Sequence, residues 1–388
     1  PPVSALSIAA SAKLPHGALK SLLAACCLAL LVLPAQAELA PLPAQPEETR
    51  WPDGGWPEAA GPEALQTRIR ETLTNEEDPH LKGVRALLVV RGGKLIGEGY
   101  RAGFDRKTHF QSWSMAKSIT HALTGILSMK GKLDITAPAP VPEWQRWDGD
   151  ARAGIRLEDL LRMQSGLTFM ENYEAPSKSH ALQMLFGSGR KDMGHYAASL
   201  PLAHDPGTHW SYSSGTSNII ARILKEAAGT QDAAAFNTFM QEELFKPIGI
   251  ESAVPEFDAS GTLIGSSFVH MTARDWARFG YLYLRDGKWN GKRLLPEGWA
   301  DHARRPARHS GGLYGAHFWL NAPDPETGKP ALSDRLPADV FMARGFGGQL
   351  VAIFPTQDMV LVMLGVVYED DAEPLVNLIA DLAESAAP

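Results

Sequence analysis

The sequence predicts an α+β fold in which one antiparallel sheet is built from both ends of the chain. Two hairpins indicate this. Residues 84–90 form an apolar run that a Gly-Gly turn joins to a second strand at residues 94–100. Near the other end, the apolar runs 349–354 and 359–366 flank a short polar turn. Between the hairpins, at about residues 114–300, the pattern is mostly helical, so we expect a helical region inserted into a sheet domain.

Helices at both ends are expected to flank this sheet. A first helix is predicted to start near Pro62, with apolar residues at helical spacing, namely Leu65, Ile69 and Leu73. A C-terminal helix is predicted from a second such set, Leu375, Leu378, Ile379 and Leu382. The predicted division is a sheet domain at 62–145 and 300–388 and a mostly helical insertion at 146–299. The proline-rich segment 38–61 is predicted to be a linker.

The amino-acid composition disfavours several kinds of protein. The 388-residue chain has 44% hydrophobic and 21% charged residues, which is typical of a globular protein. Its net charge of −7 disfavours binding by phosphate neutralisation, so no nucleic-acid partner is expected. The two cysteines, Cys26 and Cys27, are adjacent and cannot build a disulfide framework.

The N-terminal segment has the pattern of a secretory signal peptide. Two lysines precede the apolar run 22–33, and an Ala-Gln-Ala site ends at Ala37. We therefore expect residues 1–37 to be removed and the protein to be periplasmic or secreted. The run is short for a membrane span, so the mature chain is expected to have no stable span. Lipoprotein processing at Cys26 is a less favoured alternative, because the apolar lead before it is very short.

A nucleophile is indicated by Ser114-Met115-Ala116-Lys117, which matches S-x-x-K at the start of a helical pattern. Residues i and i+3 share a helix face, so the Lys117 amine can reach the Ser114 hydroxyl. The alternative is a capping serine followed by a solvated lysine. A second match, at residues 188–191, lies in a stretch rich in glycine and charge and is interpreted as chance.

This chemistry requires a partly buried site. Serine is a poor nucleophile until a base takes its proton. A lysine with a pKa of about 10.4 is almost fully charged at pH 7, so it serves as a base only if its pKa falls by about 3 units. Apolar walls would cause such a fall, and the candidates for them are Trp113, Trp210 and Trp319.

Two further segments carry polar groups in front of regular structure. Residues 205–218, which include Tyr212 and Ser214, form a Ser-rich turn before a helical pattern. Residues 343–349, Ala-Arg-Gly-Phe-Gly-Gly-Gln, lead into a strand. Taken singly, they are a polar loop before a helix and a glycine turn before a strand.

Together with S-x-x-K, in this order and at this spacing, these segments resemble the penicillin-recognising serine hydrolases. That family includes class C β-lactamases and D-alanyl-D-alanine carboxypeptidases. The chain is most similar to its esterase and 6-aminohexanoate-dimer hydrolase branch. The resemblance covers nearly all of residues 60–385 and includes the stretches 157–167, 272–280 and 314–319. It implies a β-lactamase/transpeptidase-like fold, an α/β sandwich, and hydrolysis through an acyl-enzyme.

The resemblance also implies residue roles. Ser114 would be the acylated nucleophile and Lys117 its general base. Tyr212, at the Y-x-N position, would pass the proton to the leaving group. The oxyanion hole would combine the backbone N–H groups of Ser114 and Phe346, the residue after Gly345, with Gly348 as the alternative to Phe346.

Two departures from the family pattern bear on the substrate. Ser214 replaces the asparagine of Y-x-N, and Ala343 replaces the Lys or His that opens K-T-G. In penicillin-active relatives those groups help to hold the substrate, so their loss disfavours a β-lactamase. Ser214 and Gly345 are still expected at the oxyanion or substrate-binding part of the site. Arg344 would bind a carboxylate or point to solvent.

Two weaker site candidates lie elsewhere. Tyr173 follows the Ser-Gly-Leu segment, where the amide hydrolases keep a mobile substrate-contacting loop. It is therefore either a lid residue or an ordinary loop tyrosine. His270 precedes the stretch 272–280 and is a candidate for the pocket.

The expected substrate is a small ester, amide or peptide-like molecule. No cofactor and no metal are expected, because the sequence has no H-E-x-x-H, Walker or dinucleotide motif, nor a G-x-S-x-G elbow. One alternative is a β-lactamase or D-alanyl-D-alanine carboxypeptidase. A further alternative is a non-catalytic binding protein on the same fold.

Overall fold

The computed structural model describes residues 38–173, 176–367 and 373–387. The predicted signal peptide, with Cys26 and Ala37, lies outside these residues. In the part of the chain that is described, no helix is both long enough and apolar enough to cross a bilayer.

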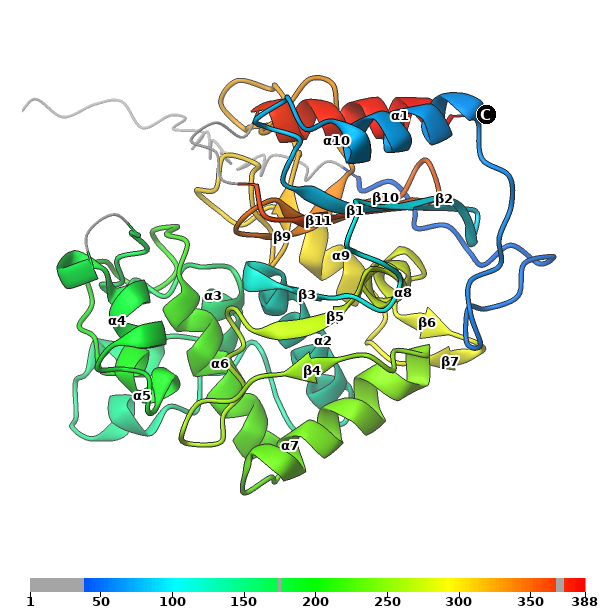
Figure 1. Ribbon diagram of the computed structural model, residues 1–388. Coiled ribbons are helices and arrows are strands. Elements are labelled where there is room, and N and C mark those ends of the chain that lie inside the picture. Colours follow the sequence, from blue (N-terminus) through cyan, green and yellow to red (C-terminus); the bar gives the residue numbers. More distant parts are fainter. Residues whose placement is uncertain (1–37, 174–175, 368–372, 388) are drawn as a thin grey trace, which may run out of the picture. The chain divides into compact units, whose positions relative to one another are not determined.

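A six-stranded antiparallel sheet has the strand order β2-β1-β11-β10-β9-β8 (Figure 1). Its strands are β1 (Val84–Arg91), β2 (Lys94–Tyr100), β8 (Trp319–Leu320), β9 (Phe341–Gly345), β10 (Gln349–Phe354) and β11 (Met359–Gly365). The two predicted hairpins are β1–β2 and β10–β11. They are joined by antiparallel pairing of β1 with β11, from Val84 opposite Gly365 to Arg91 opposite Met359. The prediction of one sheet from both chain ends is confirmed.

The sheet extends further than the sequence predicts. The pattern around residue 343 indicates only a glycine turn before a strand, whereas residues 341–345 are themselves strand β9, paired with β10. Strand β8 adds two residues beyond it. A five-residue strand that contains Arg344 and Gly345 has too little alternation to be recognised without its partner.

The two faces of the sheet are covered by different helices. Alternate residues of β1 enter different cores: Leu87 and Val89 lie on one face, and Leu88 and Val90 lie on the other. Figure 1 shows α1 (Glu63–Thr74) and α10 (Glu373–Ser385) over the first face and α8 (Ala273–Leu284) under the second. The flanking helices expected at both chain ends are therefore present.

The middle of the chain is mainly helical, as expected. Its α-helices are α2 (Ala116–Met129), α3 (Leu157–Leu161), α4 (His180–Phe186), α5 (Met193–Ala198), α6 (Ser214–Ala227), α7 (Ala233–Met240) and α9 (Trp299–Arg304). Shorter helical turns are η1 (Trp113–Met115), η2 (Pro142–Gln145), η3 (Ala151–Gly154), η4 (Pro176–Lys178), η5 (Gln241–Phe245) and η6 (Lys246–Ile248). Two small sheets also occur, made of β3 (His109–Gln111), β5 (Val269–Thr272) and β4 (Val254–Pro255), and of β6 (Lys288–Trp289) and β7 (Lys292–Arg293).

The described residues from Leu39 onward form one compact unit. The helix α8, which falls within the predicted insertion at 146–299, packs against the strands of the central sheet. The division into a sheet domain and an insertion therefore stays a prediction.

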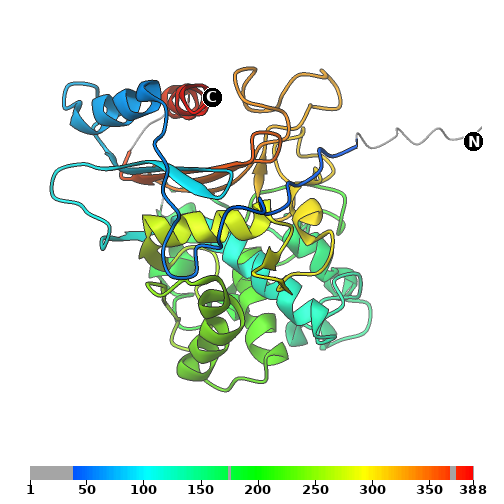
Figure 2. The same cartoon turned by 90° about the vertical axis from the view of Figure 1, so that its right-hand side faces the viewer.

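The segment predicted to be a linker packs on the rest of the protein. We call residues 39–61 the N-terminal strap; Figure 2 shows it in blue beside α8. The Trp56 side chain is 3% exposed, and its indole N–H donates to the Arg274 carbonyl at 3.1 Å. The Tyr281 hydroxyl of α8 donates to Gln45 Oε1 at 2.5 Å. These contacts hold the strap against α8.

Close approach of α8 to the sheet depends on Gly280. A Cβ at this position would lie 2.6 Å from Val351 Cγ1 and 2.8 Å from Val360 Cγ1. We expect Gly280→Ala to lower the free energy of unfolding by about 1–3 kcal/mol through overpacking, even though alanine is the better helix former. Urea unfolding would measure this, with Gly154→Ala as the control, because a Cβ at Gly154 meets nothing within 4 Å. Equal stability of Gly280→Ala and wild type would contradict the prediction.

Candidate active site

Ser114 lies in the 3₁₀ turn η1, which leads directly into α2. The turn is tied to the neighbouring strand β5 through Ser112, whose backbone N–H donates to the Val269 carbonyl at 3.0 Å. The Ser112 hydroxyl donates to the Ser267 carbonyl at 2.9 Å. Trp113 has a φ of +43°, a left-handed conformation that is uncommon for a bulky residue. This anchored turn presents Ser114 at the N-terminal end of α2.

The Lys117 amine is buried beside Ser114. Its side chain is 1% exposed, and Nζ lies 3.1 Å from Ser114 Oγ, the contact that the i, i+3 spacing predicts. Nζ also lies 3.0 Å from Ser214 Oγ and 3.0 Å from the Ser266 carbonyl oxygen. Burial lowers the pKa of Lys117 to about 8, although the nearby Glu171 carboxylate acts to raise it.

Tyr212 completes this group from the loop that precedes α6. Lys117 Nζ lies 4.9 Å from the centroid of the Tyr212 ring. The ring packs against Trp319, with centroids 5.2 Å apart. Burial and the charge of Glu171 raise the pKa of Tyr212, while a hydrogen bond to the Ser114 side chain and the charge of Arg344 act in the opposite direction. The structure thus brings Ser114, Lys117 and Tyr212 together.

Ser214 lies between Lys117 and a carboxylate that sequence reasoning missed. The Ser214 hydroxyl donates to Glu171 Oε1 at 2.6 Å, and the Ser214 backbone N–H donates to Glu171 Oε2 at 2.7 Å. The proton of the Ser214 hydroxyl is directed to Glu171, and the contact of Ser214 with substrate stays a prediction. Glu171 is 43 residues before Ser214 in an irregular segment, so no motif spacing connects the two residues.

The end of β9 lies against η1. A Cβ at Gly345 would lie 2.2 Å from the Ser112 carbonyl oxygen and 3.1 Å from Trp113 Cβ, so glycine permits this approach. The next residue, Phe346, has its ring centroid 5.6 Å from that of Trp113. A Cβ at Gly348, the alternative oxyanion residue, would instead face Leu375 and Val367. The strand end therefore places Phe346, rather than Gly348, near the Ser114 turn.

Arg344 reaches the same site from β9. Its guanidinium carbon lies 5.4 Å from the centroid of Trp319, the ring that also contacts Tyr212. Burial lowers the pKa of Arg344, and Tyr212 acts to raise it. No hydrogen bond or ion pair joins the Arg344 guanidinium to another described residue, whereas Arg278 and Arg285 each have a carboxylate partner.

Aromatic side chains line the edge of the site. Neighbouring ring centroids lie 5.6–6.3 Å apart along a series that we call the aromatic rim, made of Phe186, Phe268, Trp113, Phe346 and Tyr173. Three members are largely solvent-exposed, with exposed fractions of 55% for Phe186, 53% for Phe346 and 49% for Tyr173. The Tyr173 hydroxyl also donates to Glu171 Oε1 at 2.6 Å.

The two remaining candidates from the sequence are Trp210 and His270. Trp210 packs on Tyr314, which contacts Tyr212, so it stands one ring away from the site. His270 lies on β5 and pairs with Glu256, with Nε2 2.7 Å from Oε1. In the described part of the chain, no three His, Cys, Asp or Glu side chains are grouped closely enough to hold a metal ion.

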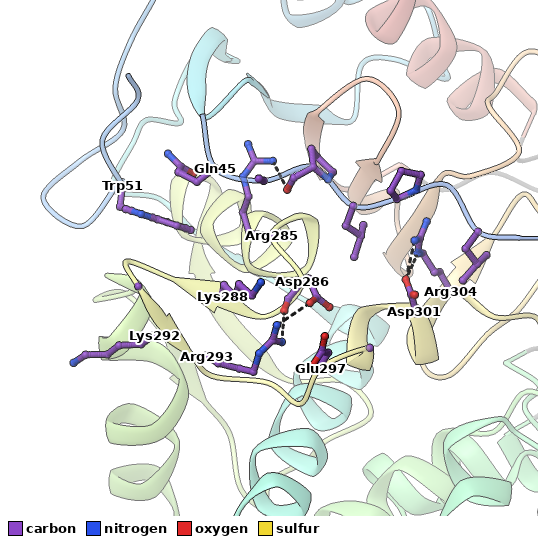
Figure 3. Close-up of a pocket in the computed structure, with 17 residues that line it drawn as sticks. Gln45, Trp51, Arg285, Asp286, Lys288, Lys292, Arg293, Glu297, Asp301 and Arg304 are labelled. Carbon is purple, nitrogen blue, oxygen red and sulfur yellow. Dashed lines mark hydrogen bonds and ion pairs between the residues drawn. The ribbon is translucent and has the colours of Figure 1, made fainter. Parts of the chain in front are cut away.

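A separate cavity of about 590 Å³ lies between the N-terminal strap and the β6–β7 hairpin (Figure 3). Charged side chains line it, but several are paired, as in Arg293 with Asp286 at 3.0 Å and Arg304 with Asp301 at 2.7 Å. Arg285 donates to the Pro43 carbonyl of the strap at 3.1 Å. None of the predicted site residues lines this cavity, so it is distinct from the Ser114 site.

Comparisons with known proteins agree with this geometry. A family model described as beta-lactamase matches residues 69–366. The 6-aminohexanoate-dimer hydrolase of Paenarthrobacter ureafaciens is 27% identical over 245 residues, which cover 61% of this chain and 58% of that protein. The alignment thus spans little more than half of the relative's length.

Solved structures show the same fold. A putative 6-aminohexanoate-dimer hydrolase from Bacillus anthracis has a TM-score of 0.65 at 21% identity, covering 89% of this chain and 90% of that one. A family VIII carboxylesterase has a TM-score of 0.60 at 14% identity, covering 85% and 98%. Together with the family model, which matches most of the chain, they confirm the β-lactamase/transpeptidase-like fold that the motifs predict. The chain belongs to the β-lactamase family, within the serine hydrolase superfamily.

Proposed function

We propose that this protein hydrolyses esters or small linear amides through an acyl-enzyme on Ser114. The observation that carries the proposal is the buried Lys117 amine, 3.1 Å from the Ser114 hydroxyl. With a pKa of about 8, roughly one lysine in ten is neutral at pH 7. For an ordinary lysine the fraction is roughly one in 2,500. The site therefore supplies the base that serine needs.

The reaction follows from the placement of these groups. Neutral Lys117 takes the proton from Ser114 Oγ as that oxygen attacks the carbonyl carbon of the substrate. The backbone N–H groups of Ser114 and Phe346 would stabilise the resulting oxyanion. Tyr212 gives its proton to the leaving alcohol or amine as the bond between that group and the carbonyl carbon breaks, and Lys117 returns the proton it took from Ser114 to Tyr212. Water then attacks the acyl-enzyme and releases the acid, and Ser114 regains its proton.

The walls of the site favour apolar linear substrates. Exposed rings of the aromatic rim, including Phe346 and Tyr173, offer apolar surface next to Ser114. Ala343 lacks the charge that the K-T-G lysine provides, and the Ser214 hydroxyl is directed to Glu171. Both differences remove contacts that the family resemblance implies for penicillin binding. Contact of Tyr173 with substrate is part of this proposal, and its movement as a lid stays a prediction.

Arg344 is the group that we propose to bind a substrate carboxylate. Its guanidinium lies beside Trp319 and Tyr212 and has no carboxylate partner among the described residues. A relative at 27% identity is named for hydrolysis of the 6-aminohexanoate dimer, a linear amide with a free carboxylate. An arginine fork pairs well with such a group.

Export stays part of the proposal. It rests on the charged, apolar and Ala-Gln-Ala regions within residues 1–37. A periplasmic or secreted location would expose the enzyme to small esters and amides from outside the cell.

Loss of the nucleophile should abolish turnover. We expect Ser114→Ala to lower kcat by about 10³-fold or more on the best substrate among a short-chain p-nitrophenyl ester, a linear amide dimer and nitrocefin. The ester or the amide dimer should be hydrolysed faster than nitrocefin. Intact-protein mass after treatment with a fluorophosphonate should show one adduct on wild type and none on Ser114→Ala. Full turnover by Ser114→Ala would rule out the acyl-enzyme.

The rate should rise with pH through the titration of Lys117. Its pKa is lowered to about 8, and only the neutral amine accepts the Ser114 proton. We therefore expect kcat/KM for a neutral ester to fall as pH decreases below about 8 and to level off above it. In Lys117→Arg the side chain stays charged, so this pH-dependent activity should disappear. A wild-type rate that is constant between about pH 6 and pH 9 would contradict the role of Lys117.

Removal of Arg344 should discriminate between substrates. We expect Arg344→Met to raise KM for an amide dimer with a free carboxylate by about 10- to 100-fold, since a hydrogen bond to a charged group contributes about 1.5–3 kcal/mol. KM for a neutral p-nitrophenyl ester should stay nearly constant. Arg146→Met, which changes an exposed arginine, is the control. Equal effects on both substrates would mean that Arg344 does not bind the carboxylate.

A further inference from the structure

The hydrogen bonds around Lys117 restrict the direction of its lone pair. Three oxygen atoms surround Nζ: Ser266 O at 3.0 Å, Ser214 Oγ at 3.0 Å and Ser114 Oγ at 3.1 Å. A neutral amine has two N–H bonds and one lone pair. The Ser266 carbonyl only accepts, so one N–H must point to it. The two serine hydroxyls compete for the lone pair and for the second N–H.

The Glu171 carboxylate determines which serine hydroxyl faces the lone pair of Lys117. The Ser214 hydroxyl has a single proton. Its polar neighbours are Lys117 Nζ, Glu171 Oε1 and the Tyr173 hydroxyl, which itself donates to Glu171 Oε1. A carboxylate only accepts, so the Ser214 proton points to Glu171, at 2.6 Å. The Ser214 oxygen must then accept from Lys117. The remaining lone pair of Lys117 faces Ser114 Oγ, where a base has to act.

We propose that Glu171 is a positioning residue that acts through Ser214 to orient the Lys117 amine toward the Ser114 hydroxyl. If the Glu171 carboxylate were absent, the Ser214 hydroxyl could turn and donate its proton to Lys117. That arrangement would occupy the lone pair and leave an N–H facing Ser114. The inference rests on the proposed function, because it concerns the base in the reaction of Ser114.

Glu171 is itself held in one orientation. Its Oε2 accepts the backbone N–H of Ser214, the first residue of α6, at 2.7 Å. The Tyr173 hydroxyl donates to Oε1 at 2.6 Å. A carboxylate at the first turn of a helix is also favoured by the helix dipole. These contacts come from two segments, so the carboxylate is fixed relative to α6.

Glu171 also supplies the negative charge near Lys117. From other elements, the groups that face this lysine are Tyr212 before α6 and His317, whose Nδ1 lies 2.8 Å from the Lys117 carbonyl oxygen; Arg344 on β9 interacts with Tyr212. Burial lowers the pKa of His317 to about 3, so it is neutral at pH 7. Loss of the Glu171 charge would lower the pKa of Lys117, because this carboxylate opposes the effect of burial.

The experiment compares Glu171→Gln with wild type in two assays across pH. The first is kcat and KM for a p-nitrophenyl ester, and the second is the rate at which a fluorophosphonate labels Ser114. We expect Glu171→Gln to lower the plateau of both rates on the order of 10- to 100-fold, as misorientation of a catalytic group does. KM should stay nearly constant. The acidic limb of both profiles should move to lower pH, because Lys117 loses the charge that favours its protonated form.

A double-mutant cycle tests the path through Ser214. Ser214→Ala should lower the plateau by a similar factor. Glu171→Gln combined with Ser214→Ala should cost little more than either change alone, because all three variants break the same chain of hydrogen bonds. Glu226→Gln, which removes an exposed carboxylate from the far end of α6, is the control and should leave both profiles unchanged.

Several results would overturn the inference. One is a pH profile of Glu171→Gln whose acidic limb and plateau coincide with those of wild type. Another is a higher KM with unchanged kcat, which would make Glu171 a substrate contact. Additive losses in the double variant would also overturn it. If Glu171→Gln fails to fold, the plateau rates of Ser214→Ala test the inference instead, and plateaus equal to those of wild type would overturn it. Absence of Ser114 labelling in wild type would instead overturn the proposed function, and this inference with it.

Discussion

The amine of Lys117 is enclosed by protein, at 1% exposure, where its charged form is expensive. Three oxygen atoms, from Ser114, Ser214 and Ser266, stabilise the amine by hydrogen bonds. These oxygens come from η1, α6 and the segment before β5, so each of those elements has to be placed within hydrogen-bonding distance of one nitrogen atom. Burial lowers the pKa of Lys117 to about 8 against the opposing charge of Glu171, and the proposed role of Lys117 as a base depends on this shift.

The central sheet provides the rigid frame for this arrangement. Pairing of β1 with β11 joins the two chain ends, and β10 then positions β9 next to η1. Contact between β9 and η1 is close enough that a Cβ at Gly345 would lie 2.2 Å from the Ser112 carbonyl oxygen. As a result, Phe346 and Arg344 reach the Ser114 site from residues that follow it by more than 200 positions. Rigid strands hold such a constellation more accurately than loops alone.

Membership of the β-lactamase family leaves the substrate open, because one fold supports several reactions. The differences from penicillin-active relatives are local. A small buried Ala343 stands at the position where the family resemblance implies a cation in penicillin-active relatives, and the Ser214 hydroxyl donates to Glu171. Under the proposed function, the aromatic rim and the Arg344 guanidinium are the groups that select the substrate. The proposed substrate is accordingly a linear molecule with an apolar part and, for amides, a carboxylate.

The sequence alone determined the two hairpins, the terminal helices and the Ser114–Lys117 contact, because each follows from local periodicity or from i, i+3 spacing. It also led to Tyr212, Arg344 and Phe346, through motif resemblance. Strands β8 and β9 and the packing of the N-terminal strap were missed, because short segments take their conformation from their partners. Only the tertiary structure decided that Ser214 faces Lys117 and that Glu171 lies behind it. That contact joins an irregular segment to a helix start 43 residues later, and no local pattern encodes a hydrogen bond across such a separation.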